Sequence, residues 1–376
     1  MEIGVFFTYG YSLQTWKNTG TLKREIKIFE EISKKYELNF TLITYGDSSE
    51  LEILNTNERI KIYPLYENFK HSKNNLIRFI KSIFFARKLR KDLNYVDVFY
   101  SNQLLGTWVP LVIKLFTNKP VLIRTGYDML DFAYKDNKKS YIIFFYKILT
   151  FVSIKFSDIF TVTNKTDKNR LEKDYPKYSN KILLRPNWVD SVEYNEIDNR
   201  HKNRIIAVGR LVEQKNFTYL LNEFSNLKKD IVIDIIGEGL EKSNLEMLAK
   251  EKNLEVNFLG SKEHKELMNQ YRKYKYFIST STFEGNPKTV LEAMASGCIV
   301  LASNIDNHSE IIDDHINGFL FDLNLGGLKK AYEEVDENID LKKVSKNAVN
   351  KTLEVNSLDK CIDDTFNDLK SLISKS

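Results

Sequence analysis

Hydrophobic and polar residues follow two different periods along this chain. Short apolar runs such as Ile3–Thr8 and Val121–Arg124 have the length and composition of buried strands, and Leu22–Tyr36 has the apolar spacing of a helix. The further strands expected in the first half are Phe40–Thr44, Arg59–Tyr63, Asp97–Tyr100, Ile159–Thr163 and Lys181–Leu184, and the further helices are Asn75–Leu93, Leu104–Phe116 and Tyr141–Phe156. Strands that alternate with helices in this way predict a doubly wound α/β fold.

The alternation stops at Arg185–Asp190 and begins again at Arg204. The strands expected in the second half are Arg204–Val208, Val232–Ile236, Val256–Leu259, Lys275–Ser279, Cys298–Ala302 and Phe319–Phe321. Two halves of the same kind predict two α/β domains that face each other across a cleft. We expect the domains to span residues 1–187 and 188–357, with a C-terminal helix in 358–376 that packs back on the first domain.

Composition limits the classes of protein that fit. A length of 376 residues is enough for two domains, and a net charge of +5 does not require a nucleic-acid partner. The cysteines, Cys298 and Cys361, lie far apart without metal-ligand spacing, which favours a reduced, cytoplasmic setting. The most apolar stretch, Tyr141–Phe160, is interrupted by charged residues, so we expect a buried helix and a strand there, with a membrane-contacting helix as the alternative.

Two glutamates bracket a turn between the expected strands at 275–279 and 298–302. The turn reads Gly285-Asn286-Pro287 and lies between Glu284 and Glu292. Asn286 is a suitable N-cap and Pro287 a suitable first helical residue, so the helix would direct free backbone amides at the carboxyl edge of the sheet. Glu292 lies in an apolar run and therefore requires a partner, which favours a ligand over an ordinary solvated glutamate.

A second segment with candidate phosphate chemistry follows the strand Arg204–Val208. Gly209 allows a close backbone turn, Arg210 can hold phosphate oxygens with two nitrogens, and Lys215 adds a charge near the next helix. Two solvated cations are the alternative interpretation. The later Gly237-Glu238-Gly239 lacks the third glycine of a dinucleotide fingerprint, so we expect it to form only a tight turn.

Other catalytic patterns are missing from the sequence. It contains no Asp-x-Asp, no Gly-x-Ser-x-Gly and no Walker motif, and its histidines lack metal-ligand spacing. We therefore expect no metal site and no cofactor.

Taken together, these motifs resemble the family 4 glycosyltransferases, which are retaining enzymes of the GT-B fold with two Rossmann-like domains. The resemblance covers about residues 204–323 and includes the Gly-Arg…Lys element, the Gly-Glu-Gly turn, the pair Glu284 and Glu292, and Glu310…Asn317-Gly318. Pro186-Asn187…Val189-Asp190 resembles the family's domain junction.

The resemblance implies a role for each of these residues. Arg210 and Lys215 would hold the donor diphosphate, Glu284 would meet hydroxyls of the donor sugar, and Glu292 would bond the ribose hydroxyls. The remaining implied donor-site residues are Gly20 with Thr21, Gly209, Gly285, Asn286, Pro287, Lys288, Val290 and Leu291. We expect Glu284, Arg210 and Lys215 to carry catalysis.

The chain departs from the family's pattern at three places. Only Gly20 stands where the family often has two glycines, and Asn216 stands where a glycine usually follows the lysine. Many members carry a histidine after the strand that ends here at Arg124, and this chain has Arg124-Thr125-Gly126-Tyr127-Asp128 instead. Arg124 and Asp128 are therefore the candidates on the acceptor side.

The expected activity is transfer of a sugar from a nucleoside diphosphate sugar to an acceptor hydroxyl, without a metal, in the assembly of cell-surface polysaccharide, lipopolysaccharide or glycolipid. The alternatives are a nucleotide-sugar epimerase of the same fold and a non-catalytic nucleotide-sugar-binding protein. Lys70–Lys91 interleaves cations with apolar residues, which fits an anionic membrane surface as well as an ordinary domain helix. The expected partners are thus a nucleotide sugar, a saccharide or lipid-linked saccharide acceptor and the inner face of the cell membrane.

Overall fold

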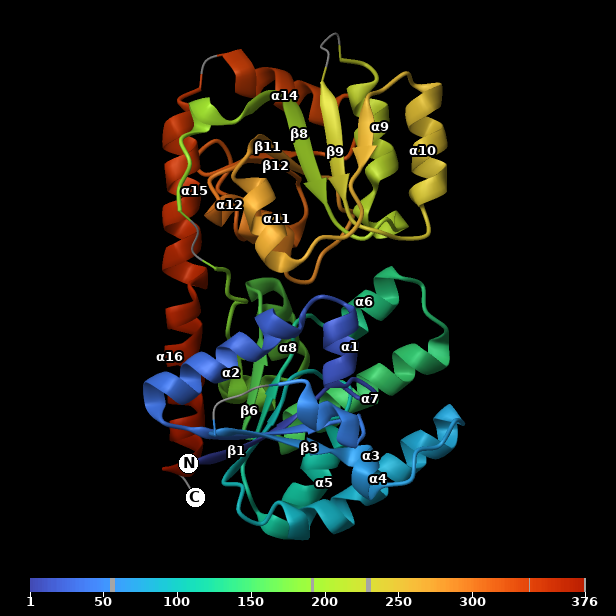
Figure 1. Cartoon of the computed structure of the whole chain (residues 1–376), viewed down its shortest axis with the longest axis vertical. Coiled ribbons are helices and arrows are strands. Elements are labelled where there is room, and N and C mark those ends of the chain that lie inside the picture. The colour runs from blue at the N-terminus through green and yellow to red at the C-terminus, as the bar shows by residue number, and fades with distance from the viewer. Residues whose placement is uncertain (55–57, 191–192, 228–230, 338, 375–376) are drawn as a thin grey trace. The chain divides into compact units, whose positions relative to one another are not determined.

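All pairings between the named strands are parallel, and the strands form two separate sheets. The computed structural model describes residues 1–54, 58–190, 193–227, 231–337 and 339–374 (Figure 1). Contacts divide the chain into a first unit, Met1–Pro186 with Asp359–Ser376, and a second unit, Asn187–Leu358. Each unit contains one of the sheets.

The first sheet has the strand order β3-β2-β1-β4-β5-β6-β7. Its strands are β1 (Glu2–Phe6), β2 (Asn39–Thr44), β3 (Ile60–Pro64), β4 (Val98–Ser101), β5 (Val121–Arg124), β6 (Ile159–Val162) and β7 (Ile182–Leu184). The order reverses between β1 and β4, and ligands of such sheets bind beyond the carboxyl ends of the strands at this switch point.

The second sheet has the order β10-β9-β8-β11-β12-β13 and reverses between β8 and β11. Its strands are β8 (His201–Val208), β9 (Val232–Ile236), β10 (Val256–Phe258), β11 (Tyr274–Ser279), β12 (Ile299–Ser303) and β13 (Phe319–Phe321). The sequence therefore predicted every one of these strands, with boundary errors of a few residues, and the doubly wound α/β class is confirmed.

Helices surround the sheet in each unit (Figure 1). Those of the first unit are α1 (Leu13–Asn18), α2 (Leu22–Tyr36), α3 (Leu65–Asn68), α4 (Asn75–Asp92), α5 (Trp108–Thr117), α6 (Met129–Lys135), α7 (Ser140–Phe156), α8 (Lys165–Asp174) and α16 (Leu358–Ile373). Those of the second are α9 (Phe217–Phe224), α10 (Lys242–Glu251), α11 (His264–Tyr271), α12 (Lys288–Ala295), α13 (Asp306–Ser309), α14 (Gly327–Glu337) and α15 (Leu341–Asn356). Among the described helices, none combines the length and apolarity that crossing a bilayer requires.

Both faces of the second sheet are buried, because neighbouring residues of one strand enter different hydrophobic clusters. In β8, Ile205 packs with helices α9, α10 and α14, whereas Ile206 packs with α11 and α12. Burial on both faces explains why the strands appear in the sequence as continuous apolar runs.

Helix α16 packs on the first unit. The rings of Tyr36 and Phe366 stack with their centroids 3.7 Å apart, and Arg185 donates two hydrogen bonds of 2.7 and 2.6 Å to Asp368. The Asp368 side chain is 7% exposed, so this ion pair is largely shielded from water.

One predicted helix has a wrong start, and some helices were missed. The helix expected from Leu104 begins only at Trp108, because Gly106 has a positive φ of 105° that interrupts the helical path. Helices α6 and α8 were not predicted, since both are short and α8 in particular carries few apolar residues.

Candidate active site

The loops that follow β8 and β11 meet at the switch point of the second sheet. The side-chain amide of Gln214 donates to the carbonyl of Phe283 at 2.8 Å, and the backbone N–H of Thr282 donates to the carbonyl of Gln214 at 2.9 Å. The Thr280 hydroxyl donates to the Lys215 carbonyl at 2.9 Å. The segments that carry Lys215 and Glu284 are thus fixed to each other by one backbone–backbone and two side chain–backbone hydrogen bonds.

Lys215 and Glu284 form an ion pair at this edge. Their side chains are 14% and 9% exposed, and the Ser281 hydroxyl donates a second hydrogen bond of 2.6 Å to the same carboxylate oxygen, Oε1. A Cβ atom at Gly209 would lie 3.2 Å from Cδ and Cε of Lys215, so glycine gives the lysine its room. Removal of either partner would leave a shielded charge without its counter-ion.

Asn216 shows why the chain tolerates a residue other than glycine after the lysine. Its φ is 52° and its ψ 42°, the left-handed conformation, and it lies at the start of α9. Asparagine adopts this conformation more readily than most residues, so the departure from the family's glycine keeps the backbone geometry.

The Gly-Glu-Gly turn packs against the loop that carries Arg210. A Cβ atom at Gly237 would lie 1.9 Å from the carbonyl oxygen of Gly209, and one at Gly239 would lie 2.2 Å from that of Leu211. Both glycines are required by this backbone contact.

Helix α12 begins one residue later than the sequence predicted. Pro287, with ψ of 75°, is the N-cap, and Lys288 is the first helical residue. The Lys288 N–H donates to the carbonyl of Asn286 at 2.8 Å, and this tight turn keeps Asn286 out of the N-cap position. The Gly285 carbonyl accepts a bond of 2.6 Å from the amide of Asn307.

The body of α12 is anchored in the core. Val290 and Leu291 are 0% and 1% exposed and lie in two different hydrophobic clusters. Their side chains hold the helix in place. The Nζ atom of Lys288 lies 4.8 Å from the centroid of the Trp188 ring, so this residue is also oriented by a contact inside the unit.

Glu292 is buried and lies beside a histidine that the sequence analysis did not single out. The carboxylate is 3.6 Å from Nδ1 of His264, and Nε2 of that ring lies 3.0 Å from the Asp190 carboxylate. Oε1 of Glu292 has no hydrogen-bond partner within the described part of the chain. A ligand hydroxyl donated to this oxygen would remove the cost of its burial.

Arg210 differs from Lys215 in its surroundings. It is exposed and forms no ion pair with any described residue. Its guanidinium can therefore rotate toward a ligand, whereas Lys215 is held in place by Glu284.

Two further residues of this region, His264 and His308, were not predicted from the sequence. His264 comes a few residues after strand β10, at the same carboxyl edge, and that position was the available signal. His308 is fully buried, with Nδ1 2.8 Å from the Ser303 carbonyl oxygen, and burial lowers its pKa to about 4. The imidazole is therefore neutral at pH 7.

The residues expected to act from the first domain lie in the first unit. Gly20, with φ of 69°, follows α1 and is exposed, with open space where a Cβ would stand, and Thr21 precedes the first residue of α2. The turn is thus built for glycine, in accordance with its left-handed backbone.

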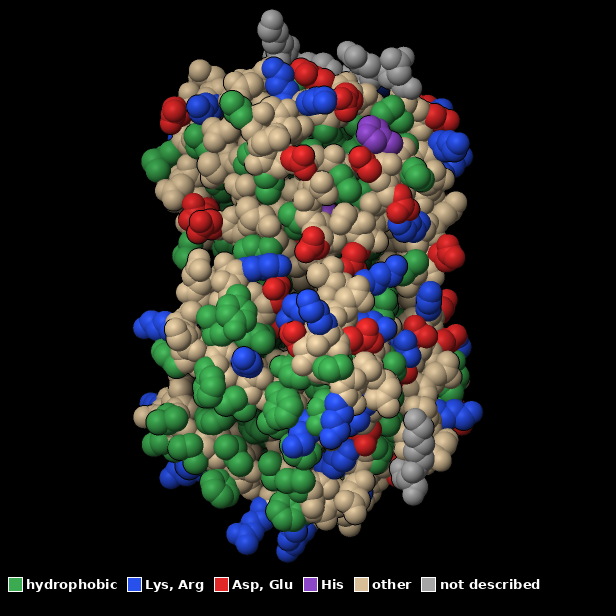
Figure 2. Space-filling view, turned by 180° about the vertical axis from the view of Figure 1, so that it is seen from behind, with side chains coloured by type: hydrophobic (Ala, Val, Ile, Leu, Met, Phe, Trp, Pro, Cys, Tyr) green, Lys and Arg blue, Asp and Glu red, His purple; other side chains and the backbone are tan. Residues whose placement is uncertain are grey.

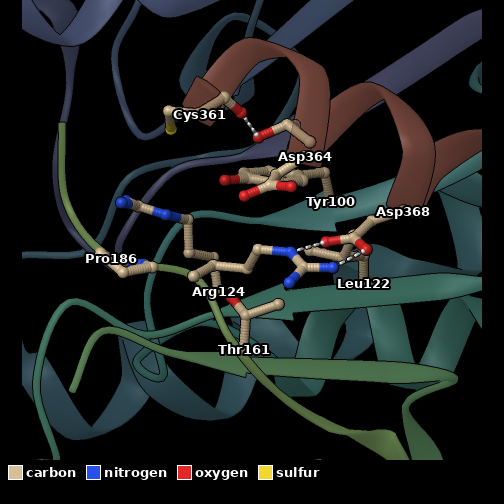
Figure 3. A pocket seen from close by; sticks show the side chains of 10 residues that line it. Tyr100, Leu122, Arg124, Thr161, Pro186, Cys361, Asp364 and Asp368 are labelled. Carbon is tan, nitrogen blue, oxygen red and sulfur yellow. Dashed lines mark hydrogen bonds and ion pairs between the residues drawn. The ribbon is translucent and has the colours of Figure 1, made fainter. Parts of the chain in front are cut away.

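Arg124 is directed toward helix α16. It lines a cavity of about 20 Å³ with Tyr100, Cys361 and Asp368, room for about one water molecule (Figure 3). The side chain therefore lies between the sheet and α16.

Asp128 caps the N-terminus of helix α6. It is the N-cap and accepts hydrogen bonds from the backbone N–H groups of Leu130, at 2.7 Å, and Asp131, at 3.0 Å. Its other oxygen pairs with Arg170, which also contacts Asp167. Burial, followed by the Asp128 charge, raises the pKa of Asp167 to about 6.

Comparison with known proteins shows which proteins this chain resembles. Residues 194–351 match the family model described as glycosyl transferases group 1. The chain is 25% identical over 355 residues to the Campylobacter jejuni N-acetylgalactosamine-N,N'-diacetylbacillosaminyl-diphospho-undecaprenol 4-alpha-N-acetylgalactosaminyltransferase, covering 92% of this chain and 93% of that protein.

Two further similarities cover most of the chain. It is 26% identical over 307 residues to the Escherichia coli UDP-Gal:alpha-D-GlcNAc-diphosphoundecaprenol alpha-1,3-galactosyltransferase, covering 77% of this chain and 78% of that one. The crystal structure of the Anabaena protein HepE in complex with UDP and glucose superposes with a TM-score of 0.75 at 14% identity, covering 99% and 100% of the two chains. The protein is a glycosyltransferase, and its fold is that of the GT-B glycosyltransferases.

Proposed function

We propose that the protein transfers a sugar, with retention of anomeric configuration and without a metal ion, from a nucleoside diphosphate sugar to a hydroxyl of a lipid-linked saccharide. The proposal depends chiefly on the shielded Lys215–Glu284 pair at the switch point of the second sheet. The reaction would serve the assembly of cell-surface polysaccharide, lipopolysaccharide or glycolipid.

In this proposal the charges of the second unit act on the departing diphosphate. Lys215, Arg210 and the first backbone N–H groups of α12 would stabilise the negative charge that develops as the sugar–phosphate bond breaks. A preorganised group of this kind contributes roughly 3–4 kcal/mol in other enzymes. Glu284 would accept bonds from sugar hydroxyls, and Glu292 from ribose hydroxyls. The leaving phosphate would help to deprotonate the acceptor on the same face of the sugar, which gives retention.

The lipid-linked acceptor is supported by two observations. The names of both relatives above contain a diphosphoundecaprenol-linked saccharide, and one name contains UDP-Gal. In addition, large exposed hydrophobic side chains gather on α4, α5 and α7 of the first unit, with lysines and arginines beside them (Figure 2). The most exposed of them are Leu76, Phe84, Leu115, Tyr141 and Phe144. We propose that this surface lies on an anionic membrane.

A transfer assay tests the activity. The purified protein is incubated with radiolabelled UDP, GDP or ADP sugars and a short-chain prenyl-diphosphate saccharide, with and without EDTA. We expect labelled acceptor with one donor class, an unchanged anomeric configuration by NMR, and the same rate in EDTA. Conversion of the sugar without an acceptor would indicate an epimerase, and donor binding without turnover a binding protein. Loss of activity in EDTA that added metal restores would refute the metal-free step.

Flotation with liposomes tests the membrane surface. Replacement of both Phe84 and Phe144 by Ser should reduce binding to anionic vesicles by roughly tenfold or more, because each buried ring contributes about 1.5–3 kcal/mol. Leu240→Ser is the matched control, because Leu240 is a similarly exposed side chain of the second unit, 92% exposed. Equal flotation of both variants would exclude this surface.

A further inference from the structure

Three tyrosines converge at the carboxyl edge of the first sheet. Tyr45 directly follows β2, Tyr9 lies in the loop after β1, and Tyr66 lies in α3, the short helix that follows β3. The ring centroids of Tyr9 and Tyr45 are 5.2 Å apart, and those of Tyr45 and Tyr66 are 6.3 Å apart. Because these three strands are neighbours in the sheet, the grouping is fixed by the fold.

The hydroxyls of this group are buried without hydrogen bonds. None of the three has a partner within the described residues, although Tyr45 is only 5% exposed. Burial raises the pKa of Tyr66 to about 12 and also raises the pKa of Tyr45 and of Tyr9, so all three remain neutral donors. Unbonded buried hydroxyls are costly unless a bound molecule accepts from them.

Arg78 of α4 adds a positive charge to the same group. Its Nη2 donates to the side chain of Asn75 at 2.5 Å and its Nη1 lies 3.1 Å from Nε2 of His71, whose ring packs edge-on against Tyr66 with the centroids 4.7 Å apart. The guanidinium forms no ion pair with a described carboxylate, and its Nε is buried without an acceptor. The positive charge of Arg78 opposes the effect of burial and lowers the pKa of Tyr9 and of Tyr66.

An unpaired guanidinium beside neutral hydroxyl donors is suited to an oxyanion with several oxygens. Gly106, from the loop after β4, lies close to this group, because a Cβ there would be 3.2 Å from the backbone nitrogen of Tyr9 and 3.7 Å from the Tyr45 hydroxyl oxygen. The group therefore lies between the loops after β1 and β4, at the switch point of the first sheet.

Helix α4 carries exposed apolar side chains beside Arg78. Leu76, Ile77 and Ile80, which flank Arg78, are 67%, 46% and 46% exposed. We propose that Tyr9, Tyr45, Tyr66 and Arg78, named here the tyrosine–arginine cluster, bind the phosphate or diphosphate of a lipid-linked acceptor, with the lipid leaving along the exposed face of α4. This inference depends on the proposed function, since it identifies the part of the acceptor that the first unit recognises.

Steady-state kinetics with two acceptors test the cluster. One acceptor is a short-chain prenyl-diphosphate saccharide, and the other is the same saccharide without phosphate. Arg78→Gln should raise the KM for the first by roughly tenfold to a hundredfold, the loss expected for hydrogen bonds to a charged group, and leave the KM for the second and for the donor unchanged. Tyr66→Phe should give a smaller rise in the same KM, and Arg78→Lys should restore part of it.

Lys81→Gln is the matched control, because it removes one positive charge from an exposed position of the same helix. If Arg78→Gln and Lys81→Gln change the KM for the diphosphate acceptor equally, the cluster is not a phosphate site. A calorimetric titration with inorganic pyrophosphate and a flotation assay with anionic vesicles distinguish binding of a phosphate group from binding of a lipid surface. Pyrophosphate binding that Arg78→Gln abolishes supports the proposal, and an effect of Arg78→Gln on vesicles alone overturns it.

The outcomes also separate this inference from the proposed function. Absence of transfer by the wild-type protein would refute the proposed function, and the pyrophosphate titration would still report on the cluster. Normal transfer by Arg78→Gln, with circular dichroism showing a folded variant, would refute the cluster alone.

Discussion

Each sheet has a positively charged side chain near its carboxyl edge, which is paired with a carboxylate in the second unit and has no carboxylate partner among the described residues in the first. At the second edge Lys215 is in contact with Glu284, and that carboxylate also accepts from Ser281. At the first edge Arg78 has no carboxylate partner among the described residues, and the nearby tyrosine hydroxyls have no bonds. The paired edge is preorganised before a ligand arrives, whereas the unpaired edge gains its missing bonds only from a ligand.

The two units also differ in how buried titratable groups respond to pH. In the second unit His308 has a pKa lowered to about 4, and in the first Asp167 has a pKa raised to about 6, both chiefly through burial. Each group is therefore favoured in its neutral form by folding. Because one is a base and the other an acid, acidification should weaken the second unit through His308 and strengthen the first through Asp167.

The largest effect is expected for the paired edge. Lys215→Ala should lower kcat by roughly a hundredfold to a thousandfold, because in the proposed reaction it removes a preorganised charge from the leaving diphosphate. It should also reduce the free energy of unfolding by about 3 kcal/mol, since Glu284 is left shielded and unpaired. Lys330→Ala, in the exposed part of α14, serves as the control. A kcat within threefold of the wild-type value would remove Lys215 from the mechanism.

The second largest effect is expected for the loss of folding stability that protonation of His308 causes at low pH. Its folded pKa of about 4 lies below the ordinary 6.5, so the unfolded chain binds the proton first and stability falls as the pH drops from 6.5 to 4. The loss attributable to this residue is about 3 kcal/mol over that range. Denaturant titrations of the wild type and His308→Gln at pH 7 and pH 4 measure it. The variant should show the weaker pH dependence, and parallel curves would contradict the assignment.

Glu292→Ala tests the second carboxylate of the paired edge. The variant should raise the KM for the nucleotide sugar by roughly tenfold to a hundredfold with a smaller change in kcat, because in the proposed complex the lost bonds hold the ribose in both ground and transition states. Glu246→Ala, an exposed glutamate of α10, is the matched control. A reduced kcat at unchanged KM would place Glu292 in the chemical step instead.

The smallest effect is expected at Asp167. Its raised pKa means that stability is complete below the ordinary value of 3.8 and is lost as the pH rises through about 6. Asp167→Asn should therefore stabilise the first unit by about 1 kcal/mol at pH 7.5 and should have no effect on its stability at pH 4. The stabilisation at pH 7.5 is this small because the variant also loses the contact with Arg170. Hydrogen exchange of β6 reports on the unit, with the exposed Asp174→Asn as control. Destabilisation at pH 7.5 would refute the prediction.

The elements of the fold were predictable because their signals are local. The runs that became β5, β9 and β13 were assigned with the observed bounds, as was α2. A buried strand needs consecutive apolar residues and a surface helix needs an apolar stripe, and both are visible within a single segment. The start of α12 was off by one residue because the bond from Lys288 to Asn286 depends on how that turn is closed.

The side-chain partners were not predictable in this way. Lys215 and Glu284 are 69 positions apart, and their contact depends on β8 and β11 being neighbours at the switch point. Arg124 was a candidate for the acceptor side, and its position in a small cavity with residues of α16 could not be read from the sequence, because a residue at a strand end can face either side of the sheet.

The sequence by itself therefore determined the α/β alternation, the motif-bearing loops and the residue types available for phosphate chemistry, since each is encoded in neighbouring residues. Only the tertiary structure decided which charges are paired, as for Lys215, and which stay unpaired, as for Arg78. The physical reason is that pairing depends on distances between segments remote in the chain, and these distances are set by strand order and helix packing.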